Sequence, residues 1–470
     1  MGFWLVGCQN FEQMNENPNE PTEVTSDVLL ASGMRQVVTT VTEESFLLGN
    51  NAAQITAKTL RTEVDAYNWN AFPTLWDGLY SGLTDLHKVE DVALSSGNLK
   101  MQGVAKVMQC YAYSVLTNAY GDIPYSEAIQ GGDNNFTPIY DAQENVYASL
   151  LSSLSEAVTM LEGDGQISGD IIYGNDADQW IKFAQSLKLR LLMNASAKVS
   201  NAQDQFAAIV TDGRIMTSNE DNAALSYLSG FPNQFPLIPL KTGDFDAVAL
   251  SQNMYNSLSE HHDPRLSRYA RPNDDVYDVI SDSSSFSGAV NGSNSGNCSK
   301  DGSRLGPQFY NYPGFTDASS LGLSMAEGIM MSYAELCFIL AEAADKGWIA
   351  NVVADEYKNG IQASMDYYQV NYDAFGYTDF EDFYTNSGIA YTNASDIWRQ
   401  KWTALFFHGM EPYFEVRRWY VESGDSFDNI PFLDLPCEDL NGGQLPMRFL
   451  YPGEEQSLNA ANYSAAVDKL

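Results

Sequence analysis

The chain has few basic residues. Its 25 lysines and arginines stand against 61 aspartates and glutamates, which gives a net charge of −36. Such a negative field repels phosphate backbones and anionic lipid, so we expect no nucleic-acid partner. Sulfated and uronate-rich polysaccharides are disfavoured for the same reason, whereas neutral glycans, peptides and cations are compatible with this charge.

Catalytic motifs and long apolar runs are missing as well. The sequence has no HExxH, GxSxG, P-loop or GxGxxG motif and no run of eighteen apolar residues. A membrane-spanning helix is therefore not expected. A glycosidase needs only two suitably spaced carboxylates, and nothing singles out such a pair among the 61 acids. We expect a protein that is not an enzyme.

Histidine and cysteine are scarce, at 4 and 5 residues. The neighbouring His261-His262 point apart on most backbones and no third ligand is in place, which favours a solvated loop over a metal site. Cys110 and Cys337 lie on helical apolar faces and are interpreted as packed thiols. Cys298 and Cys437 lie in loop-like sequence, where a disulfide between them is one possibility.

Two acidic loops bear on cofactors. Asp244-Phe245-Asp246 and Asn273-Asp274-Asp275 carry carboxylates of the kind that bind calcium, but neither has EF-hand spacing. A structural calcium ion is one interpretation and a solvated surface is the other. No other cofactor is expected.

A strong helical pattern runs from Lys100 to Ala119. Its apolar residues recur at helical spacing, and Gly121 is expected to end it in a left-handed conformation, with Pro124 preventing its continuation. Another helix opens at Pro73, and the connection Ser95–Asn98 joins the two into a helix hairpin. The stripe of the 100–119 helix consists of Val104, Val107, Met108, Tyr111 and Val115.

Similar patterns predict helices along much of the chain. Asp141 with Glu144 resembles a capping box, and Asp176 or Asp178 is expected to cap a further helix. Pairs of roughly 34–40 residues indicate a mainly α fold in which helix pairs stack like tetratricopeptide repeats, although the repeat's W-x2-L-G-x2-Y pattern is not intact. The predicted helices cover residues 26–48, 73–89, 100–119, 146–161, 180–192, 331–348, 357–368 and 395–407.

The sequence predicts one large domain behind an extended tether. Residues 1–25 form the tether, and 26–470 form the domain. Its helical body comprises 26–210 and 328–420, interrupted by a loop-rich insertion at 211–327 and followed by a loop-rich tail at 421–470. An insertion of this length is expected to contain short strands and helices of its own.

The N-terminus contains a lipobox-like segment, Leu5-Val6-Gly7-Cys8, in which Cys8 would be lipidated. Only Met1 to Trp4 precede it, without a positive charge. Either the chain begins inside a signal peptide or the match is accidental.

Several segments in order resemble the SusD/RagB-type outer-membrane nutrient-binding lipoproteins of the Bacteroidetes. They are Cys8 with Asn17-Pro18-Asn19, TNAYGDIPYSEA (117–128), DPRL (263–266), YAELCFILAEAA (333–344) and HGMEPYFEVRRW (408–419). The resemblance implies a SusD-like fold and a lipid-anchored protein on the outer-membrane surface. It also implies a partner, a SusC-like TonB-dependent transporter over which the protein acts as a lid without covalent chemistry.

Aromatic residues are plentiful, with 27 Tyr, 23 Phe and 8 Trp. Sugars stack their C–H faces on such rings and hydrogen-bond to Asn, Asp and Arg. Two loops, at residues 65–70 and 309–315, combine these groups. The resemblance implies by position alone that they form an arc around a glycan. The candidate ligand-binding residues are Arg61, Asp65, Tyr67, Trp69, Asn70, Tyr310 and Tyr312.

The alternative is that these rings fill the core beneath long loops, as most Trp and Tyr do. Trp76, Tyr80, Trp180, Trp402 and Trp419 are expected in the core for that reason.

We expect capture of oligosaccharides and their delivery to the transporter. Three alternatives remain: the same lid role with oligopeptides, a helical-repeat scaffold whose loop rings are buried, and a hydrolase with two carboxylates about 5–10 Å apart in a ring-flanked cleft.

Overall fold

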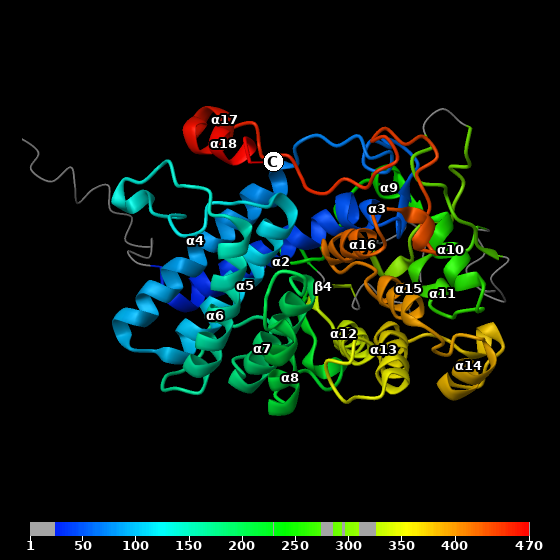
Figure 1. Ribbon diagram of the computed structural model, residues 1–470, viewed down its shortest axis with the longest axis horizontal. Helices are drawn as coiled ribbons and strands as arrows, with labels where there is room; N and C mark the ends of the chain where they lie inside the picture. Colours follow the sequence, from blue (N-terminus) through cyan, green and yellow to red (C-terminus); the bar gives the residue numbers. More distant parts are fainter. Residues whose placement is uncertain (1–23, 229, 274–284, 294–296, 310–325, 470) are drawn as a thin grey trace, which may run out of the picture.

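The computed structural model describes residues 24–228, 230–273, 285–293, 297–309 and 326–469, and it is mainly helical, as predicted (Figure 1). Several predictions fall outside these residues, namely those for Cys8, the segment 17–19, Tyr310 and Tyr312, and most of the tether.

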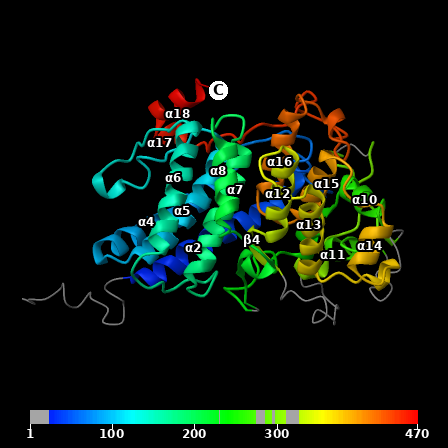
Figure 2. The same ribbon diagram turned by 60° about the horizontal axis from the view of Figure 1, so that its bottom comes forward.

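The first half of the helical body is a row of long helices (Figures 1 and 2). In this row α2 packs on α4, α4 on α5, α5 on α6, and α6 on α7. Their bounds are Ser26–Glu44 for α2, Pro73–Ser96 for α4, Leu99–Tyr120 for α5, Gln143–Leu161 for α6 and Ala177–Asn194 for α7. A π-helical turn, η1 at Ser45–Gly49, extends α2.

Local sequence explains the tight α4–α5 hairpin. Gly97 has a φ of 69°, in the left-handed region that favours glycine, and it ends α4. The side chain of Asn98 then caps α5 by accepting a hydrogen bond from the Met101 N–H at 3.2 Å. Glycine also allows α2 to approach α4, because a Cβ on Gly82 would come within 2.6 Å of a Val37 methyl group.

The second half of the body consists of α12, α13, α15 and α16, with the shorter α14 beside them (Figure 2). The bounds are Tyr333–Asp345 for α12, Val353–Tyr368 for α13, Phe380–Asn386 for α14, Ala394–Ala404 for α15 and Glu411–Glu422 for α16. A main hydrophobic core runs through both halves, and a smaller one lies among α12, α13, α14 and α15.

Buried ion pairs join helices both between and within the two halves. Arg190 on α7 makes a bidentate pair with Glu335 on α12, with both N–O distances at 2.6 Å. Lys401 on α15 lies 2.9 Å from Glu415 on α16, and the Arg418 guanidinium lies 2.6 Å from Glu342. Because these side chains are at most 9% exposed, the charges are almost entirely shielded from water.

The insertion contains short elements, as predicted. Strand β1 (Thr56–Lys58) pairs antiparallel with β3 (Val248–Leu250), Ala57 facing Ala249. Strand β2 (Ala223–Ser226) pairs antiparallel with β4 (Glu327–Met331). The middle of the insertion thus joins the body through β3 and β1, and the beginning and end of the insertion pair with each other through β2 and β4.

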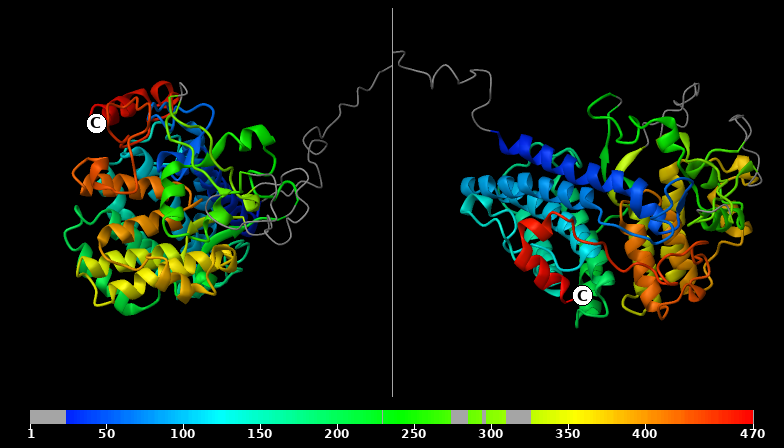
Figure 3. Two further views of the ribbon diagram at one scale, coloured as in Figure 1. Left: turned by 90° about the vertical axis from the view of Figure 1, so that its right-hand side faces the viewer. Right: turned by 90° about the horizontal axis from the view of Figure 1, so that it is seen from above.

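The remaining short elements are α3 at Asn50–Ala52, η2 at Gly131–Asp133, α8 at Ala202–Asp212, η3 at Asn219–Asp221, α9 at Thr242–Phe245, α10 at Gln252–Ser259, α11 at Leu266–Tyr269, η5 at Pro307–Phe309, η7 at Asp373–Phe375, η8 at Phe427–Asn429, α17 at Glu455–Leu458 and α18 at Ala460–Val467. The two C-terminal helices lie beside the connection that precedes α6 (Figure 3), where Tyr140 donates a hydrogen bond to Glu455 at 2.5 Å.

Two local predictions are wrong. Gly121 has a positive φ of 84°, but its ψ of −118° lies outside the left-handed helical region. Asp141 does not cap α6, because its carboxylate instead accepts hydrogen bonds from the Tyr125 and Ser126 N–H groups. The helical body continues after residue 407 with a further helix, α16, whose Pro412 lies in the first turn, where proline is tolerated.

Other local predictions are confirmed. Asp176 caps α7 through the N–H groups of Asp178 and Gln179. Cys110 and Cys337 are free, buried thiols. The expected core tryptophans are all buried, and Tyr80 is partly buried against the core: Trp76, Trp180, Trp402 and Trp419 are at most 5% exposed.

Candidate functional site

The aromatic loop, residues 61–72, connects β1 to α4 and begins with a compact turn. The Ala66 N–H donates to the Thr62 carbonyl at 2.9 Å, and the Asn68 N–H donates to the Glu63 carbonyl at 2.9 Å. In this turn the side chains of Asp65 and Tyr67 are buried, whereas those of Asn68 and Asn70 are exposed.

Asp65 points inward and is completely buried. Its carboxylate accepts a hydrogen bond from the Lys58 N–H at 2.6 Å and another from the Asn291 side chain at 3.2 Å. Burial raises the pKa of Asp65 to about 7, against the opposing effect of the Lys58 N–H bond. Asp65 therefore supports the loop from beneath and is not available for direct contact with a ligand.

Tyr67 also points inward. It is 2% exposed, its hydroxyl accepts a hydrogen bond from the Gln54 amide at 2.9 Å, and its ring stacks on Phe427 at 6.2 Å. Burial raises the pKa of its hydroxyl. Tyr67 therefore agrees with the alternative in which the loop rings fill the core.

Trp69 lies at the boundary between core and surface. Its indole N–H donates to the Val64 carbonyl at 3.0 Å, and its ring meets Tyr413 and Phe449 edge-on, at 5.2 and 4.9 Å between centroids. The indole is only partly buried. It is thus held in one orientation with part of its surface open to water.

The insertion and the tail hold the loop from two sides. Asn291 donates to the Thr56 carbonyl at 2.8 Å, and its own carbonyl accepts from the Cys437 N–H at 2.9 Å. The Leu440 N–H donates to the Ala66 carbonyl at 2.8 Å. Close packing requires glycine at Gly292, where φ is 73° and a Cβ would lie 2.8 Å from Pro436.

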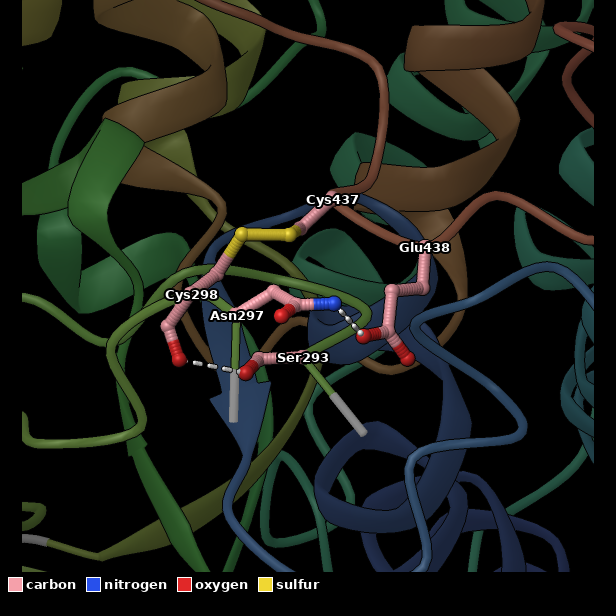
Figure 4. The surroundings of a disulfide bond; sticks show 5 residues. All are labelled: Ser293, Asn297, Cys298, Cys437 and Glu438. Carbon is pink, nitrogen blue, oxygen red and sulfur yellow. Dashed lines mark hydrogen bonds between the residues drawn. A yellow bond between two sulfur atoms is a disulfide. The ribbon is translucent and has the colours of Figure 1, made fainter. Parts of the chain in front are cut away.

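A disulfide joins Cys298 to Cys437, across 139 residues of sequence (Figure 4). Around it, the Ser293 hydroxyl donates to the Cys298 carbonyl at 2.6 Å, and the Asn297 amide donates to Glu438 at 3.4 Å. The bond ties the insertion to the tail beside the aromatic loop.

The structure brings some predicted site residues to the surface. Arg61 and Asn70 are exposed, as is the intervening Asn68, and Trp69 is partly exposed between the two asparagines. A partly open indole flanked by amides can stack on a sugar ring and hydrogen-bond to its hydroxyls. Of the second predicted loop, Phe309 is buried and stacks on Phe407 at 4.2 Å, whereas Tyr310 and Tyr312 lie outside the described residues.

Sequence reasoning missed the residues that hold Trp69 and Tyr67. Tyr413, Phe449 and Gln54 come from α16, the tail and the end of α3. No spacing in the sequence relates these positions to the loop, so no sequence signal could have identified them.

The described residues contain no group of three or more metal-binding side chains. Asp246 of the proposed calcium loop lies 3.1 Å from Arg271, an ion pair that occupies its carboxylate. His262 is exposed, as expected for a solvated loop, but the neighbouring Asp263 is buried in an ion pair with Arg265 at 2.6 Å.

Comparison with known families finds one match, to the SusD-like family described as starch-binding and associating with the outer membrane, over residues 18–452. No curated protein matches the chain. In the part of the chain that the structure describes, no helix is long and apolar enough to cross a membrane.

Solved structures share the whole fold. An outer-membrane protein of Bacteroides vulgatus, to which nutrient binding has been ascribed, is 27% identical with a TM-score of 0.78, over 95% of this chain and 96% of that one. A SusD homologue of Bacteroides fragilis is 25% identical with a TM-score of 0.77, over 95% and 96%. A chitin-binding SusD homologue of Flavobacterium johnsoniae is 20% identical with a TM-score of 0.72, over 94% and 96%.

Proposed function

This chain belongs to the SusD-like family, and from that premise we propose that it is a surface-exposed, non-catalytic lipoprotein that captures oligosaccharides and delivers them to a SusC-like TonB-dependent transporter. The observation that carries the proposal is the match to this starch-binding, outer-membrane family across residues 18–452. The similar fold of a chitin-binding homologue agrees with a glycan ligand.

The aromatic loop is the proposed capture site, and Trp69 is its centre. A ring already fixed by Tyr413, Phe449 and the Val64 carbonyl loses little conformational freedom on binding. Asn70 and Arg61 supply exposed hydrogen-bond donors on the same loop. Asp65 and Tyr67 act from below by holding the loop in place.

The delivery step needs binding and movement only. In the proposed arrangement Cys8 carries the lipid anchor, and the protein opens and closes as a lid over the transporter. Because neutral glycans carry no charge, the net charge of −36 does not oppose their approach.

Isothermal titration with a panel of neutral oligosaccharides and mixed oligopeptides tests the proposal. The protein would lack Cys8 and would be measured with and without Trp69→Ala. We expect oligosaccharide binding that weakens about tenfold in the variant, because an aromatic contact contributes on the order of 1 kcal/mol beyond its buried area.

Two further variants distinguish the loss of a ligand contact from misfolding of the protein. Trp348→Ala removes another partly buried indole, packed on Phe206 at 5.6 Å, and should leave the affinity unchanged. Asn70→Ala changes an exposed loop residue and should weaken binding without affecting the fold.

The alternatives predict other outcomes. Peptide binding without glycan binding would keep the lid role and replace the ligand class. No binding to any member of the panel would favour a helical-repeat scaffold. The burial of Tyr67 agrees with that alternative, whereas the partial exposure of Trp69 does not.

A further inference from the structure

A groove of about 1170 Å³ opens between α6, the C-terminal end of α7 with its connection to α8, and α16. It shares no lining residue with the aromatic loop. Its volume exceeds the roughly 300–1,000 Å³ of ordinary small-molecule pockets, so it has room for a chain of several sugar units.

Arg417 forms part of one wall and is rigidly held. Its guanidinium donates through Nη1 to the Asn118 and Met447 carbonyls at 2.6 and 2.8 Å, and it lies 5.5 and 5.3 Å from the ring centroids of Tyr413 and Phe414. No carboxylate within the described part of the chain forms an ion pair with it. Its positive charge is therefore oriented in advance, by carbonyls and aromatic rings and not by a carboxylate.

Two lysines lie on the other side of the groove. Lys188 is partly buried, and its ammonium donates to the Ser155 hydroxyl at 2.5 Å; burial lowers its pKa, and no acidic side chain counteracts that effect. Lys198 is exposed. Neither lysine forms an ion pair with any residue that the structure describes.

The acidic residues of the groove do not cancel these charges. Glu422 is paired with Arg418 at 2.8 Å, and Glu156 lies 3.9 Å from Lys106. Glu144 is the remaining carboxylate in the lining. Because Lys106 lies closer to Glu90, at 3.0 Å, Glu156 is only weakly paired. Three cations without ion-pair partners, Arg417, Lys188 and Lys198, thus face Glu144 and the weakly paired Glu156, within a chain whose net charge is −36.

The nearby charges decide what can bind here. At physiological ionic strength, interactions between exposed charges fade beyond about 8 Å, so the distant acidic surface affects a ligand in the groove less than Arg417 and Lys188 do. A partly buried cation without a partner is also costly, and an anionic group would remove that cost.

The remaining lining favours a sugar chain over a peptide. Helices supply most of the wall, and their backbone groups are already hydrogen-bonded, so no strand edge is available to an extended peptide. Short hydroxyl and amide side chains, which hydrogen-bond well to sugar hydroxyls, complete the lining: Ser152, Asn194, Ser196, Ser200 and Gln205.

We propose that this groove is a second glycan site, which binds the carboxylates of a uronic-acid-containing oligosaccharide through Arg417, Lys188 and Lys198. The inference rests on the proposed role in oligosaccharide capture and adds a ligand class that the net charge alone disfavours. Arg417 is the main anchor because, with Nη1 bonded to the Asn118 and Met447 carbonyls, its Nε–Nη2 edge can still engage a carboxylate with two donors.

Isothermal titration with tetragalacturonate, with its fully methyl-esterified form as the neutral match, tests the site. We expect the acid form to bind and the ester to bind at least tenfold more weakly. Arg417→Gln should weaken binding of the acid form about tenfold. Lys198→Gln, at an exposed position where folding is not at risk, should weaken it about threefold.

Lys88→Gln is the matched control, because it removes an exposed positive charge on α4 outside the groove and should leave the affinity within twofold. Equal binding of acid and ester, equal losses in Lys88→Gln and Lys198→Gln, no binding of tetragalacturonate, or equally tight binding of tetraglutamate would each overturn the proposal.

The two glycan sites can fail separately. Arg417 and Trp69 contact the same ring, Tyr413, but the groove variants should leave neutral-glycan binding intact. A protein that binds tetragalacturonate in the groove and ignores every neutral sugar would retain this inference and lose the aromatic-loop site.

Discussion

The row of helices and the aromatic loop are stabilised over very different distances in sequence. In the row, α4 and α5 pack across a short connection, and α12 and α13 do the same in the second half. The buried Arg190–Glu335 pair then joins the two halves. Beneath the loop, Gln54, which donates to the Tyr67 hydroxyl, also donates to the Asp434 carbonyl 380 residues away. Asp65 of the loop accepts from Asn291 across 226 residues. The loop's shape therefore depends on the insertion and the tail.

Because of this difference, we expect the helical body to determine the stability of the chain and the loop to determine its ligand contacts. Changes in the helical body should act on the free energy of unfolding of the whole chain. Changes around the loop should act first on the loop's order and on the ligand contacts that it presents.

The largest effect is expected from Arg190→Met in the body. It would leave Glu335, which is fully buried, without its bidentate partner, at a cost of about 3–5 kcal/mol in the free energy of unfolding. Urea denaturation followed by circular dichroism measures the change. Arg214→Met removes a surface pair with Asp212 and should cost less than about 1 kcal/mol; equal costs in both variants would contradict the role of burial.

A smaller effect is expected when the disulfide is removed by Cys298→Ser together with Cys437→Ser. Because the bond closes a segment of 139 residues, its loss should lower the free energy of unfolding by about 2–4 kcal/mol. Hydrogen exchange should accelerate more at residues 62–67 and 288–293 than in α5.

The unmodified protein under reducing conditions provides the matching control, and the double variant should not respond to the reductant. Equal acceleration in α5 and in the loop would show that the disulfide supports the entire chain, and the contrast between the two regions would be lost.

The last effect concerns pH. Burial raises the pKa of Asp65 to about 7 from an ordinary 3.8, so the folded state holds the proton more tightly than the unfolded state does. This stabilisation is complete below pH 3.8 and is lost as the pH rises to 7. Asp65→Asn lacks this loss, so its unfolding free energy relative to the unmodified protein should increase between pH 4.5 and 7.5.

Denaturation of both proteins at the two pH values measures the difference. Glu411→Gln provides the same comparison in the helical body, because burial also raises the pKa of Glu411. Its unfolding free energy relative to the unmodified protein should likewise increase with pH. A difference between Asp65→Asn and the unmodified protein that is the same at both pH values would mean that Asp65 is already ionised in the folded protein.

Much of the helical body could be predicted because its information is local. The stripe from Val104 to Val115 and the cap at Asp176 depend on residues within a few turns. The same local reasoning failed at Asp141, whose carboxylate turns to the backbone of Tyr125 and Ser126. When a side chain has two possible hydrogen-bond partners, the tertiary structure decides which of them it bonds.

The candidate site was only partly predictable. Its composition identified the loop, and Trp69 and Asn70 do reach the surface. Asp65 and Tyr67 look equally suitable in sequence, but the turn at 62–68 directs both inward. The groove at Arg417 left no sequence signal, because its walls come from helices more than two hundred residues apart.

By itself, the sequence determined the mainly helical fold, the family and the choice of an aromatic loop, because periodic apolar residues and ordered motifs are properties of neighbouring positions. Only the tertiary structure decided which aromatic rings are exposed, that Cys298 meets Cys437, and that Arg417, Lys188 and Lys198 face a common groove. Burial and the pairing of charges depend on segments that meet only when the chain has folded.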